Sequence, residues 1–187
     1  TGRSGNTSPE AKIFSADSLR PVSFSGQRLM ILETDELALG FTEGRFSEKH
    51  LADYFAGMTV VSLRQTHSSL IVETDSGEKQ IEGDGILVSR TRIVAIIRTA
   101  DCVPLFFFAR TSRRELRAGI LHIGWKGLLQ GIEKNLIARL KTDGVAPDEI
   151  DFLTGPAIGP ECYRVGEDLT ALFRGRSLFP QIFSDNG

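Results

Sequence analysis

Three residues that could hold a metal ion or carry out nucleophilic catalysis stand at the ends of apolar, strand-like segments. The chain has only five histidine and cysteine residues, which are His50, His67, His122, Cys102 and Cys162. Three of these, His67, Cys102 and His122, adjoin runs rich in Val, Ile and Leu. One thiolate with two imidazoles suits Zn²⁺ with a fourth position open to water, and it also resembles the ligand set of blue copper sites.

The spacing of these residues leaves three interpretations open. The gaps of 35 and 20 positions differ from compact motifs such as CxxC or HExxH. The residue types alone are consistent with a metal site, with two structural histidines and a buried thiol, or with a metal-free Cys102–His122 nucleophilic pair. Asp84 or Asp101 could act as an acid or base, or could orient a ligand histidine. Asp101 could equally cap a turn.

The segments that would position these residues predict a mixed α/β fold. Seven β-rich runs occupy residues 29–32, 59–63, 70–73, 85–88, 93–98, 104–109 and 117–122. Apolar residues between Leu128 and Leu140 follow a period of about 3.6, which predicts a helix that ends before Gly144. A hairpin turn at Asp75-Ser76-Gly77, a strand at 151–153 and a short helix at 167–173 are also expected. His122 therefore stands at a strand-to-helix junction, where N–H groups favour anions.

Composition and charge exclude several classes of protein. The chain has 187 residues, 41% of them hydrophobic and 25% charged, with a net charge of −2. These values argue against disorder and nucleic-acid binding, and no apolar run is long enough to span a membrane. Two cysteines and no apolar signal segment in residues 1–20 favour a cytoplasmic location.

The length predicts one domain over residues 16–187, after a flexible or vector-derived end at residues 1–15. Because the chain stops soon after the apolar residues 178–183, we expect the C-terminal part of this domain to be missing. Trp125 is expected in the core, Cys162 in a structural role and His50 on the surface.

Four motifs carry a family resemblance through their order and spacing. They are residues 65–67 (QTH), 99–105 (TADCVPL), 122–127 (HIGWKG) and 155–160 (GPAIGP). The acidic segment 82–85 and the pair Cys162-Tyr163 fit the same pattern. Together these motifs resemble the multicopper polyphenol oxidase, or laccase-domain, family, which includes the YfiH group of purine nucleoside phosphorylases. The resemblance covers roughly residues 38–175.

The resemblance implies a fold, a cofactor and an activity. The fold would be a layered α-β-β-α sandwich, with Zn²⁺ rather than copper held by His67, Cys102 and His122. The activity would be phosphorolysis of inosine, adenosine or guanosine to the base and ribose 1-phosphate, with adenosine deamination as a further reaction. The expected partners are therefore a nucleoside and phosphate.

The remaining site residues fall into two groups. The expected catalytic residues are Cys102, His122, Asp84 and Asp101, and the expected substrate- or phosphate-binding residues are Lys126, Gln65, Gly124 and Gly127. Lys126 stands where the family usually has arginine, so it keeps the charge but loses bidentate phosphate geometry. The loop at 41–47 is altered relative to the family, and the stretch from there to Gln65 is shorter.

Other functions remain as alternatives. Cys102 could be the nucleophile of an amide hydrolase with His122 as its base, and metal content would discriminate this from a zinc enzyme. Editing of peptidoglycan precursors is also attributed to the family. Copper polyphenol oxidation is disfavoured because three histidines cannot furnish a multicopper site. A non-catalytic binding module would follow if the shortened loop had removed the substrate pocket.

Overall fold

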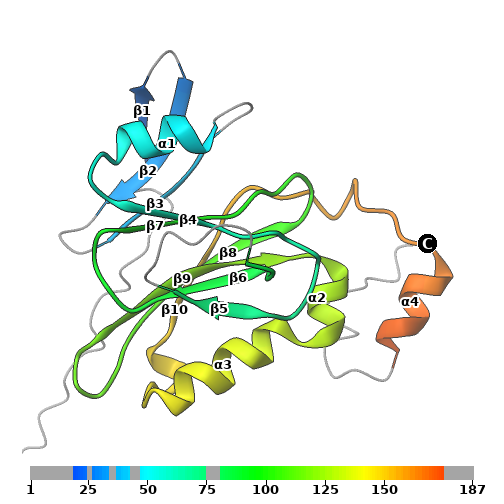
Figure 1. Cartoon of the computed structure of the whole chain (residues 1–187). Coiled ribbons are helices and arrows are strands. Elements are labelled where there is room, and N and C mark those ends of the chain that lie inside the picture. The colour runs from blue at the N-terminus through cyan, green and yellow to red at the C-terminus, as the bar shows by residue number, and fades with distance from the viewer. Residues whose placement is uncertain (1–18, 25–26, 34–36, 43–46, 75–80, 175–187) are drawn as a thin grey trace, which may run out of the picture.

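The computed structural model describes residues 19–24, 27–33, 37–42, 47–74 and 81–174, and these form a mixed α/β fold (Figure 1). The strands are β1 (Arg20–Phe24), β2 (Gln27–Glu33), β3 (Ala38–Thr42), β4 (Thr59–Ser62), β5 (Ile71–Glu73), β6 (Gly85–Val88), β7 (Ile93–Ile96), β8 (Val103–Arg110), β9 (Leu116–Ile123) and β10 (Asp151–Thr154). The helices are α1 (Glu48–Tyr54), α2 (Trp125–Gln130), α3 (Ile132–Thr142) and α4 (Glu167–Phe173), with a short 3₁₀ turn at Pro147–Glu149. The mixed α/β expectation is confirmed.

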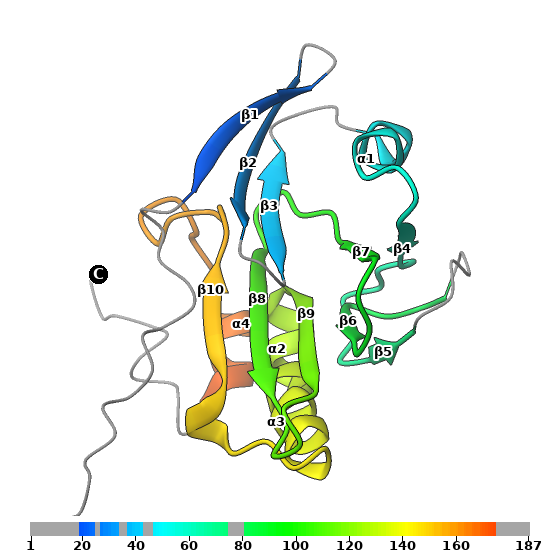
Figure 2. The same ribbon diagram turned by 90° about the vertical axis from the view of Figure 1, so that its left-hand side faces the viewer.

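These elements form four layers. A five-stranded sheet has the order β10-β8-β9-β6-β5. In Figure 1, α2 and α3 lie against one face of this sheet, while β1–β3, β4, β7 and α1 lie on the other side. Figure 2 shows β10, β8 and β9 side by side in front of the helices. The second β layer consists of the sheet β1-β2-β3 and the parallel pair β4-β7, so the order of layers is α-β-β-α, as expected.

The five-stranded sheet is apolar on both faces because layers cover it from both sides. Along β8, Phe106 and Phe108 join a core with the second β layer, whereas Phe107 and Ala109 join a core with α3. Leu136 and Leu140 on α3 complete the second of these cores. Apolar side chains on both faces of β8 fit a central strand that is buried on both sides.

The helical expectation needs one correction. The apolar period predicts one continuous helix, but α2 ends and α3 begins at Gly131, whose φ is 83°. This left-handed conformation suits glycine, which has no Cβ to clash with the backbone. A one-residue interruption leaves the apolar stripe nearly in phase, so the periodicity does not reveal it.

The strand between residues 70 and 73 is followed by a different connection from the one expected. The predicted turn at Asp75-Ser76-Gly77 lies outside the described residues. The next described strand, β6, runs parallel to β5, with Ile71 opposite Gly85, so these two strands do not form a hairpin. The charged residues 113–115 lie in the exposed connection of the antiparallel pair β8-β9. In the described part of the chain, no helix is both long and apolar enough to cross a membrane.

A pair of phenylalanines tests the importance of the helical layer. Phe107 and Phe152 are opposite each other on β8 and β10, yet Phe107 is 1% exposed and Phe152 is 43% exposed. We expect Phe107→Ala to lower the free energy of unfolding by about 3–5 kcal/mol, because it leaves a cavity under α3. The matched change Phe152→Ala should cost roughly 1 kcal/mol or less. Urea denaturation measures both, and equal costs would contradict this assignment of the core.

Candidate functional site

Three separate elements bring His67, Cys102 and His122 together. His67 lies in the loop between β4 and β5, Cys102 directly precedes β8, and His122 lies near the end of β9. One ligand atom from each lies within 4.8 Å of the others, and the two imidazole rings meet edge to face. Zinc bonds to nitrogen and sulfur are about 2.0–2.3 Å long, so a small closure of the side chains would let one ion reach all three. The residues therefore form a candidate metal site.

A buried carboxylate behind the site orients two of the three ligands. Asp84 is 0% exposed, and its Oδ1 accepts hydrogen bonds from the His122 ring at Nδ1 (2.8 Å) and from the His67 backbone N–H (3.0 Å). Its Oδ2 accepts from the Ser68 backbone N–H (2.6 Å), the Ser68 hydroxyl (2.7 Å) and the Thr66 N–H (3.2 Å). Asp84 therefore fixes the loop of His67 and the ring of His122 at once.

The ionisation of Asp84 determines which nitrogen of His122 faces the site. Burial alone raises the pKa of the Asp84 carboxyl, but hydrogen bonds from His122, Ser68 and Thr66 outweigh burial and hold the pKa below 3.8. The ionised carboxylate accepts the proton that His122 carries on Nδ1. Nε2 of His122 is then left as the acceptor that can bind a metal ion.

The backbone at His67 has an uncommon conformation. Its φ is 57°, in the left-handed region that residues other than glycine seldom occupy. Three successive N–H groups, those of Thr66, His67 and Ser68, point at Asp84 and hold the loop in this shape. Strained conformations of this kind persist where surrounding contacts over-determine them, which is common at functional sites.

Two glycines allow α2 to begin very close to the ligands. A Cβ placed on Gly124 would lie 2.8 Å from Cδ2 of His67 and 3.1 Å from Sγ of Cys102, so a side chain there would fill the space between them. A Cβ on Gly127 would lie 2.9 Å from the Ser68 carbonyl oxygen. Both glycines are buried. Their contacts give them a packing role, and their expected role in substrate binding stays a prediction.

Gln65 joins the two loops that carry His67 and Cys102. Its side-chain Nε2 donates to the carbonyl oxygen of Arg98 (2.8 Å), and its Oε1 accepts from the Arg98 N–H (2.8 Å). Both polar atoms of the amide are thus engaged with backbone. The structure gives Gln65 a positioning role, and direct binding of substrate by this side chain stays a prediction.

Trp125 and Lys126 are the first two residues of α2, directly after Gly124. The Lys126 ammonium lies 5.5 Å from the centroid of the Trp125 ring, and both residues are exposed. The expectation that Trp125 belongs to the core is wrong, since 36% of it is exposed. Trp125 is therefore available for a bound molecule.

The environment of Cys102 disfavours a free thiolate. Burial raises the pKa of the Cys102 thiol, and the negative charges of Asp101 and Asp84 raise it further. An active thiolate nucleophile needs the opposite, a positive environment that lowers its pKa. A bound metal cation would reverse this effect and favour the thiolate. These electrostatics favour a metal ligand over a metal-free nucleophile.

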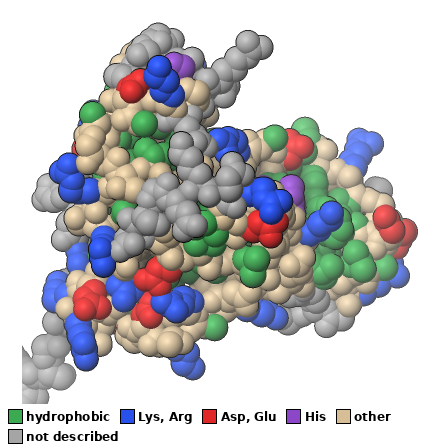
Figure 3. Space-filling model, in the orientation of Figure 1, with side chains coloured by type: hydrophobic (Ala, Val, Ile, Leu, Met, Phe, Trp, Pro, Cys, Tyr) green, Lys and Arg blue, Asp and Glu red, His purple; other side chains and the backbone are tan. Residues whose placement is uncertain are grey.

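Tyr163 is a neighbour of the site to which the sequence assigned no role. Burial and the charges of Cys102 and Asp101 raise the pKa of its hydroxyl, which places it close to both residues. It lines a hollow of about 340 Å³ with Trp125, Leu169 and Leu172. In Figure 3, apolar side chains gather on the right of the molecule beside a histidine, over α2 and α4. Spacing in the sequence could not show that α4 closes this hollow.

The comparison with protein families identifies the chain. Residues 47–185 match the family described as "Multi-copper polyphenol oxidoreductase laccase". The chain belongs to this family. The solved structure of a hypothetical protein YfiH from Bacillus licheniformis shares this fold with the laccase-family chain, with a TM-score of 0.68 at 24% identity over 88% of this chain and 78% of that protein. The expected family is therefore confirmed.

Two curated relatives of this laccase-family chain carry enzyme names. A purine nucleoside phosphorylase from Clostridium acetobutylicum is 30% identical over 163 residues, which are 83% of this chain and 68% of the relative. An adenosine deaminase from an unknown prokaryotic organism is 30% identical over 128 residues, covering 62% of this chain and 47% of the relative. The chain thus spans between about half and two thirds of these relatives. The names support an enzyme.

Replacement of Asp84 tests its role as the anchor of the site. An asparagine side chain at this position would face some of the same donors with an NH₂ group, so we expect Asp84→Asn to lower the free energy of unfolding by about 3–5 kcal/mol at neutral pH. Asp148→Asn, at an exposed 3₁₀ turn, is the matched control. Because the folded-state pKa of Asp84 lies below 3.8, its contribution is present above that pH and is lost as the pH falls further.

The difference between the wild type and Asp84→Asn should therefore be largest at about pH 7 and should shrink below about pH 4. Denaturant titrations at several pH values measure it. A difference that grows on acidification would contradict the assignment of a low pKa to Asp84.

Alkylation of Cys102 distinguishes a metal ligand from an activated nucleophile. In metal-free protein with Cys162→Ser, Cys102 is the only thiol. Its reaction with iodoacetamide should be slow at neutral pH and should accelerate only above about pH 9, because burial and nearby carboxylates raise its pKa above 9.0. Mass spectrometry follows the rate. Fast alkylation near pH 6 would instead favour a Cys102 hydrolase.

Proposed function

We propose that this chain is a zinc-dependent purine nucleoside phosphorylase, which splits inosine, adenosine or guanosine with phosphate into the base and ribose 1-phosphate. The observation that carries the proposal is the convergence of His67, Cys102 and His122 beside an open hollow. The relative named purine nucleoside phosphorylase supports the choice of reaction.

The residues present fit a single zinc ion. The donor set is one sulfur and two imidazoles, which leaves a fourth position for a substrate oxygen or water. The glycine at 124 supports the same conclusion, because a Cβ there would occupy the space beside His67 and Cys102. When bound, zinc would act as a Lewis acid that polarises an oxygen and lowers the pKa of bound water. Copper could use the same donors, so the metal requires direct measurement.

The hollow beside the site fits a nucleoside. Trp125 and Tyr163 present aromatic surface, and Leu169 and Leu172 add apolar surface at the same hollow. A purine ring can stack on such aromatic faces. We assign the purine to this hollow, so that the ribose lies toward Cys102.

Lys126 is the residue we assign to phosphate. Lys126 is exposed, its ammonium lies beside the Trp125 ring, and it stands two residues after Gly124, which packs against His67 and Cys102. As a compact point charge, it can bind phosphate without the bidentate geometry of arginine. We therefore expect weaker binding of phosphate than an arginine would give, with little discrimination against other oxyanions.

The proposed reaction transfers a ribosyl group from nitrogen to oxygen. A phosphate oxygen forms a bond to ribose C1′ while the bond from C1′ to the purine nitrogen breaks, and the proton that the hydrogen phosphate loses passes to the departing base. We assign the proton transfer to Asp101, which is exposed and near enough to Cys102 for its charge to raise the pKa of that thiol. Asp84 is fully engaged in hydrogen bonds and acts by positioning His122.

Adenosine deamination is the second candidate, because one relative is named an adenosine deaminase. Hydrolytic removal of the C6 amino group also uses an activated water at a mononuclear zinc site. The same hollow would hold the substrate, with the base rather than the ribose toward the metal ligands. The two reactions give different products, so one assay separates them.

The test incubates zinc-loaded protein with inosine or adenosine in the presence and absence of phosphate. Phosphorolysis produces hypoxanthine or adenine with ribose 1-phosphate only when phosphate is present, whereas deamination converts adenosine to inosine without it. Chromatography identifies the products, and elemental analysis measures the bound metal. We expect Cys102→Ala to lose the metal and to reduce turnover on the order of 100-fold or more.

The matched control is Cys162→Ala, which removes the exposed thiol outside the ligand set. It should keep metal content and turnover within about twofold of the wild type. Full turnover by metal-free protein, or turnover that survives Cys102→Ala, would overturn the zinc assignment. The absence of either reaction in zinc-loaded protein would overturn the proposed function.

A further inference from the structure

The hollow beside the metal ligands has two charged side chains to which the proposed reaction gives no role. Arg164 and Asp168 line this hollow of about 340 Å³ together with Trp125 and Tyr163. Arg164 directly follows Tyr163, and Asp168 lies in the first turn of α4. In Figure 3, acidic and basic side chains border the apolar patch over α2 and α4. The hollow thus has charged groups of both signs beside its aromatic surface.

These two side chains have no partner among the described residues. The guanidinium of Arg164 and the carboxylate of Asp168 form no hydrogen bond or ion pair within the described part of the chain. Their neighbour Glu167, by contrast, forms an ion pair with Arg174 at 2.7 Å. A guanidinium has only hydrogen-bond donors, and an ionised carboxylate has only acceptors. Arg164 and Asp168 can therefore offer one donor group and one acceptor group to a bound molecule.

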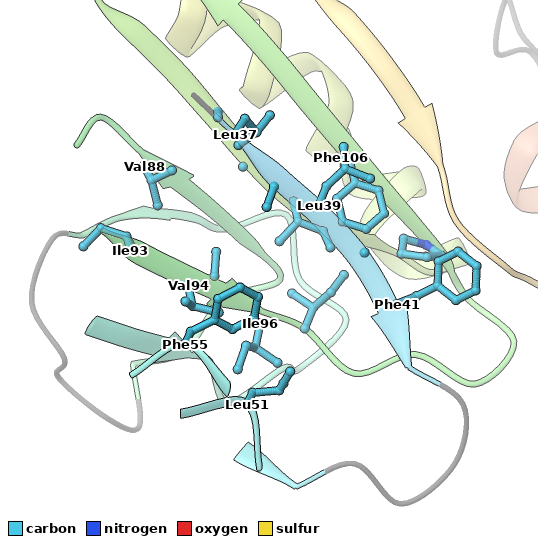
Figure 4. A pocket seen from close by; sticks show the side chains of 18 of the residues that line it. Leu37, Leu39, Phe41, Leu51, Phe55, Val88, Ile93, Val94, Ile96 and Phe106 are labelled. Atoms are coloured by element: carbon cyan, nitrogen blue, oxygen red, sulfur yellow. The ribbon is translucent and has the colours of Figure 1, made fainter. Parts of the chain in front are cut away.

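A larger cavity elsewhere in the chain lacks this combination of groups. It has a volume of about 860 Å³ and lies between β3 and β7 (Figure 4). The described residues that line it include arginines but neither Asp nor Glu, and one of them, Arg92, already donates to the carbonyl oxygen of Gly57 (2.8 Å). None of the three candidate metal ligands lines this cavity. The hollow beside α2 is therefore the better match for a nucleoside that must reach the metal ligands.

The edge of a 6-oxopurine that is remote from the ribose has groups complementary to this pair. Hypoxanthine and guanine have a carbonyl acceptor at O6 and an N–H donor at N1, and guanine adds an amino donor at C2. Adenine has the reverse pattern, with an amino donor at C6 and an acceptor at N1. Because the ribose lies toward Cys102 in the proposed complex, this edge faces away from the metal ligands. One donor group and one acceptor group at that edge can distinguish the two classes of purine.

We propose that Arg164 and Asp168 select 6-oxopurine nucleosides, such as inosine and guanosine, over adenosine. The Arg164 guanidinium would donate to O6, and the Asp168 carboxylate would accept from N1–H. Adenosine would place its amino donor against the guanidinium and its N1 acceptor against the carboxylate, so both contacts would be lost. This inference rests on the proposed function, because it requires the purine to occupy the hollow. It favours phosphorolysis of inosine or guanosine over deamination of adenosine.

The expected preference is moderate because both side chains are exposed. Hydrogen bonds to charged groups are stronger than neutral ones, but water competes for an exposed guanidinium or carboxylate. We therefore expect inosine to bind about tenfold more tightly than adenosine. 1-Methylinosine keeps O6 but lacks the proton on N1, so it should also bind about tenfold more weakly than inosine.

The test measures the binding of nucleosides to the zinc-loaded whole chain in the absence of phosphate. Trp125 is the only tryptophan of the chain and lines the hollow, so its fluorescence reports binding there. Titrations with inosine, adenosine and 1-methylinosine give three dissociation constants, and chromatography gives the concentration of unchanged adenosine in each sample. Asp168→Asn should bring the constants for inosine and adenosine within about twofold of each other, because an amide can donate to N1 of adenine as well as accept from N1–H.

Two further variants separate the role of Arg164 from a general effect of charge. Arg164→Met should weaken the binding of inosine about tenfold and leave that of adenosine within about twofold, because only inosine has an acceptor at C6. Glu167→Gln is the matched control for Asp168→Asn, because it removes a neighbouring charge of α4 that does not line the hollow. It should keep the preference for inosine within about twofold of the wild type. Circular dichroism confirms that the variants are folded.

The result that would overturn this proposal differs from the one that would overturn the proposed function. Equal binding of inosine and adenosine by the wild type, tighter binding of adenosine, or no binding of either would overturn the selection of 6-oxopurines. An unchanged ratio in Asp168→Asn, or equal weakening of both nucleosides by Arg164→Met, would do the same. The proposed phosphorylase activity is tested separately, by the formation of ribose 1-phosphate from any of these nucleosides.

Discussion

The candidate site depends on one buried carboxylate. Asp84 directly precedes β6, which lies between β9 and β5 in the five-stranded sheet, and its two oxygens accept five hydrogen bonds. One of these fixes the tautomer of His122 and three hold the backbone around His67. A buried charge is stable only when it is fully hydrogen-bonded, so the loop, the ring and the carboxylate stabilise one another. Loss of any one of these groups would leave the others with unsatisfied hydrogen bonds, which would lower the free energy of unfolding.

Close packing around this carboxylate explains the pattern of glycines. Gly83, Gly85 and Gly124 each have a neighbouring side-chain atom within 3 Å of where a Cβ would lie. Small residues thus let the β4–β5 loop, the five-stranded sheet and α2 meet with little space between them. The geometry of the candidate metal site follows from this packing, because each ligand comes from a different element.

The sequence predicted the candidate ligands but not the hydrogen bonds that hold them in place. Scarce residue types and the family resemblance were enough to select His67, Cys102 and His122. The orienting role was only one of several that the sequence left open for Asp84. The left-handed backbone at His67 has no local signal, since it results from hydrogen bonds to a residue 17 positions away. The sequence also could not show that the amide of Gln65 hydrogen-bonds to the backbone of a residue 33 positions away.

For the fold, too, the sequence predicted local features but not the contacts between distant residues. Periodicity identified most strands and the apolar face of α3, because these depend on neighbouring residues. It missed the break at Gly131, which shifts the period by only one residue, and it could not show that β5 and β6 run parallel. It also gave no sign that β3 pairs with β2 and β7 pairs with β4 in separate sheets. Strand pairing and cavities depend on contacts between distant residues, which a single sequence does not display.

The number of histidines in the chain is too small for the multicopper chemistry that the descriptive name of its family implies. Multi-copper oxidation requires several copper centres, for which imidazoles are the principal ligands. The chain has three histidines, two of them at one site, and the third, His50, lies in α1 with its Nδ1 against the Ser47 hydroxyl. The histidines can therefore serve a single mononuclear centre. With zinc bound, such a centre would suit the proposed phosphorolysis and deamination, neither of which involves net electron transfer.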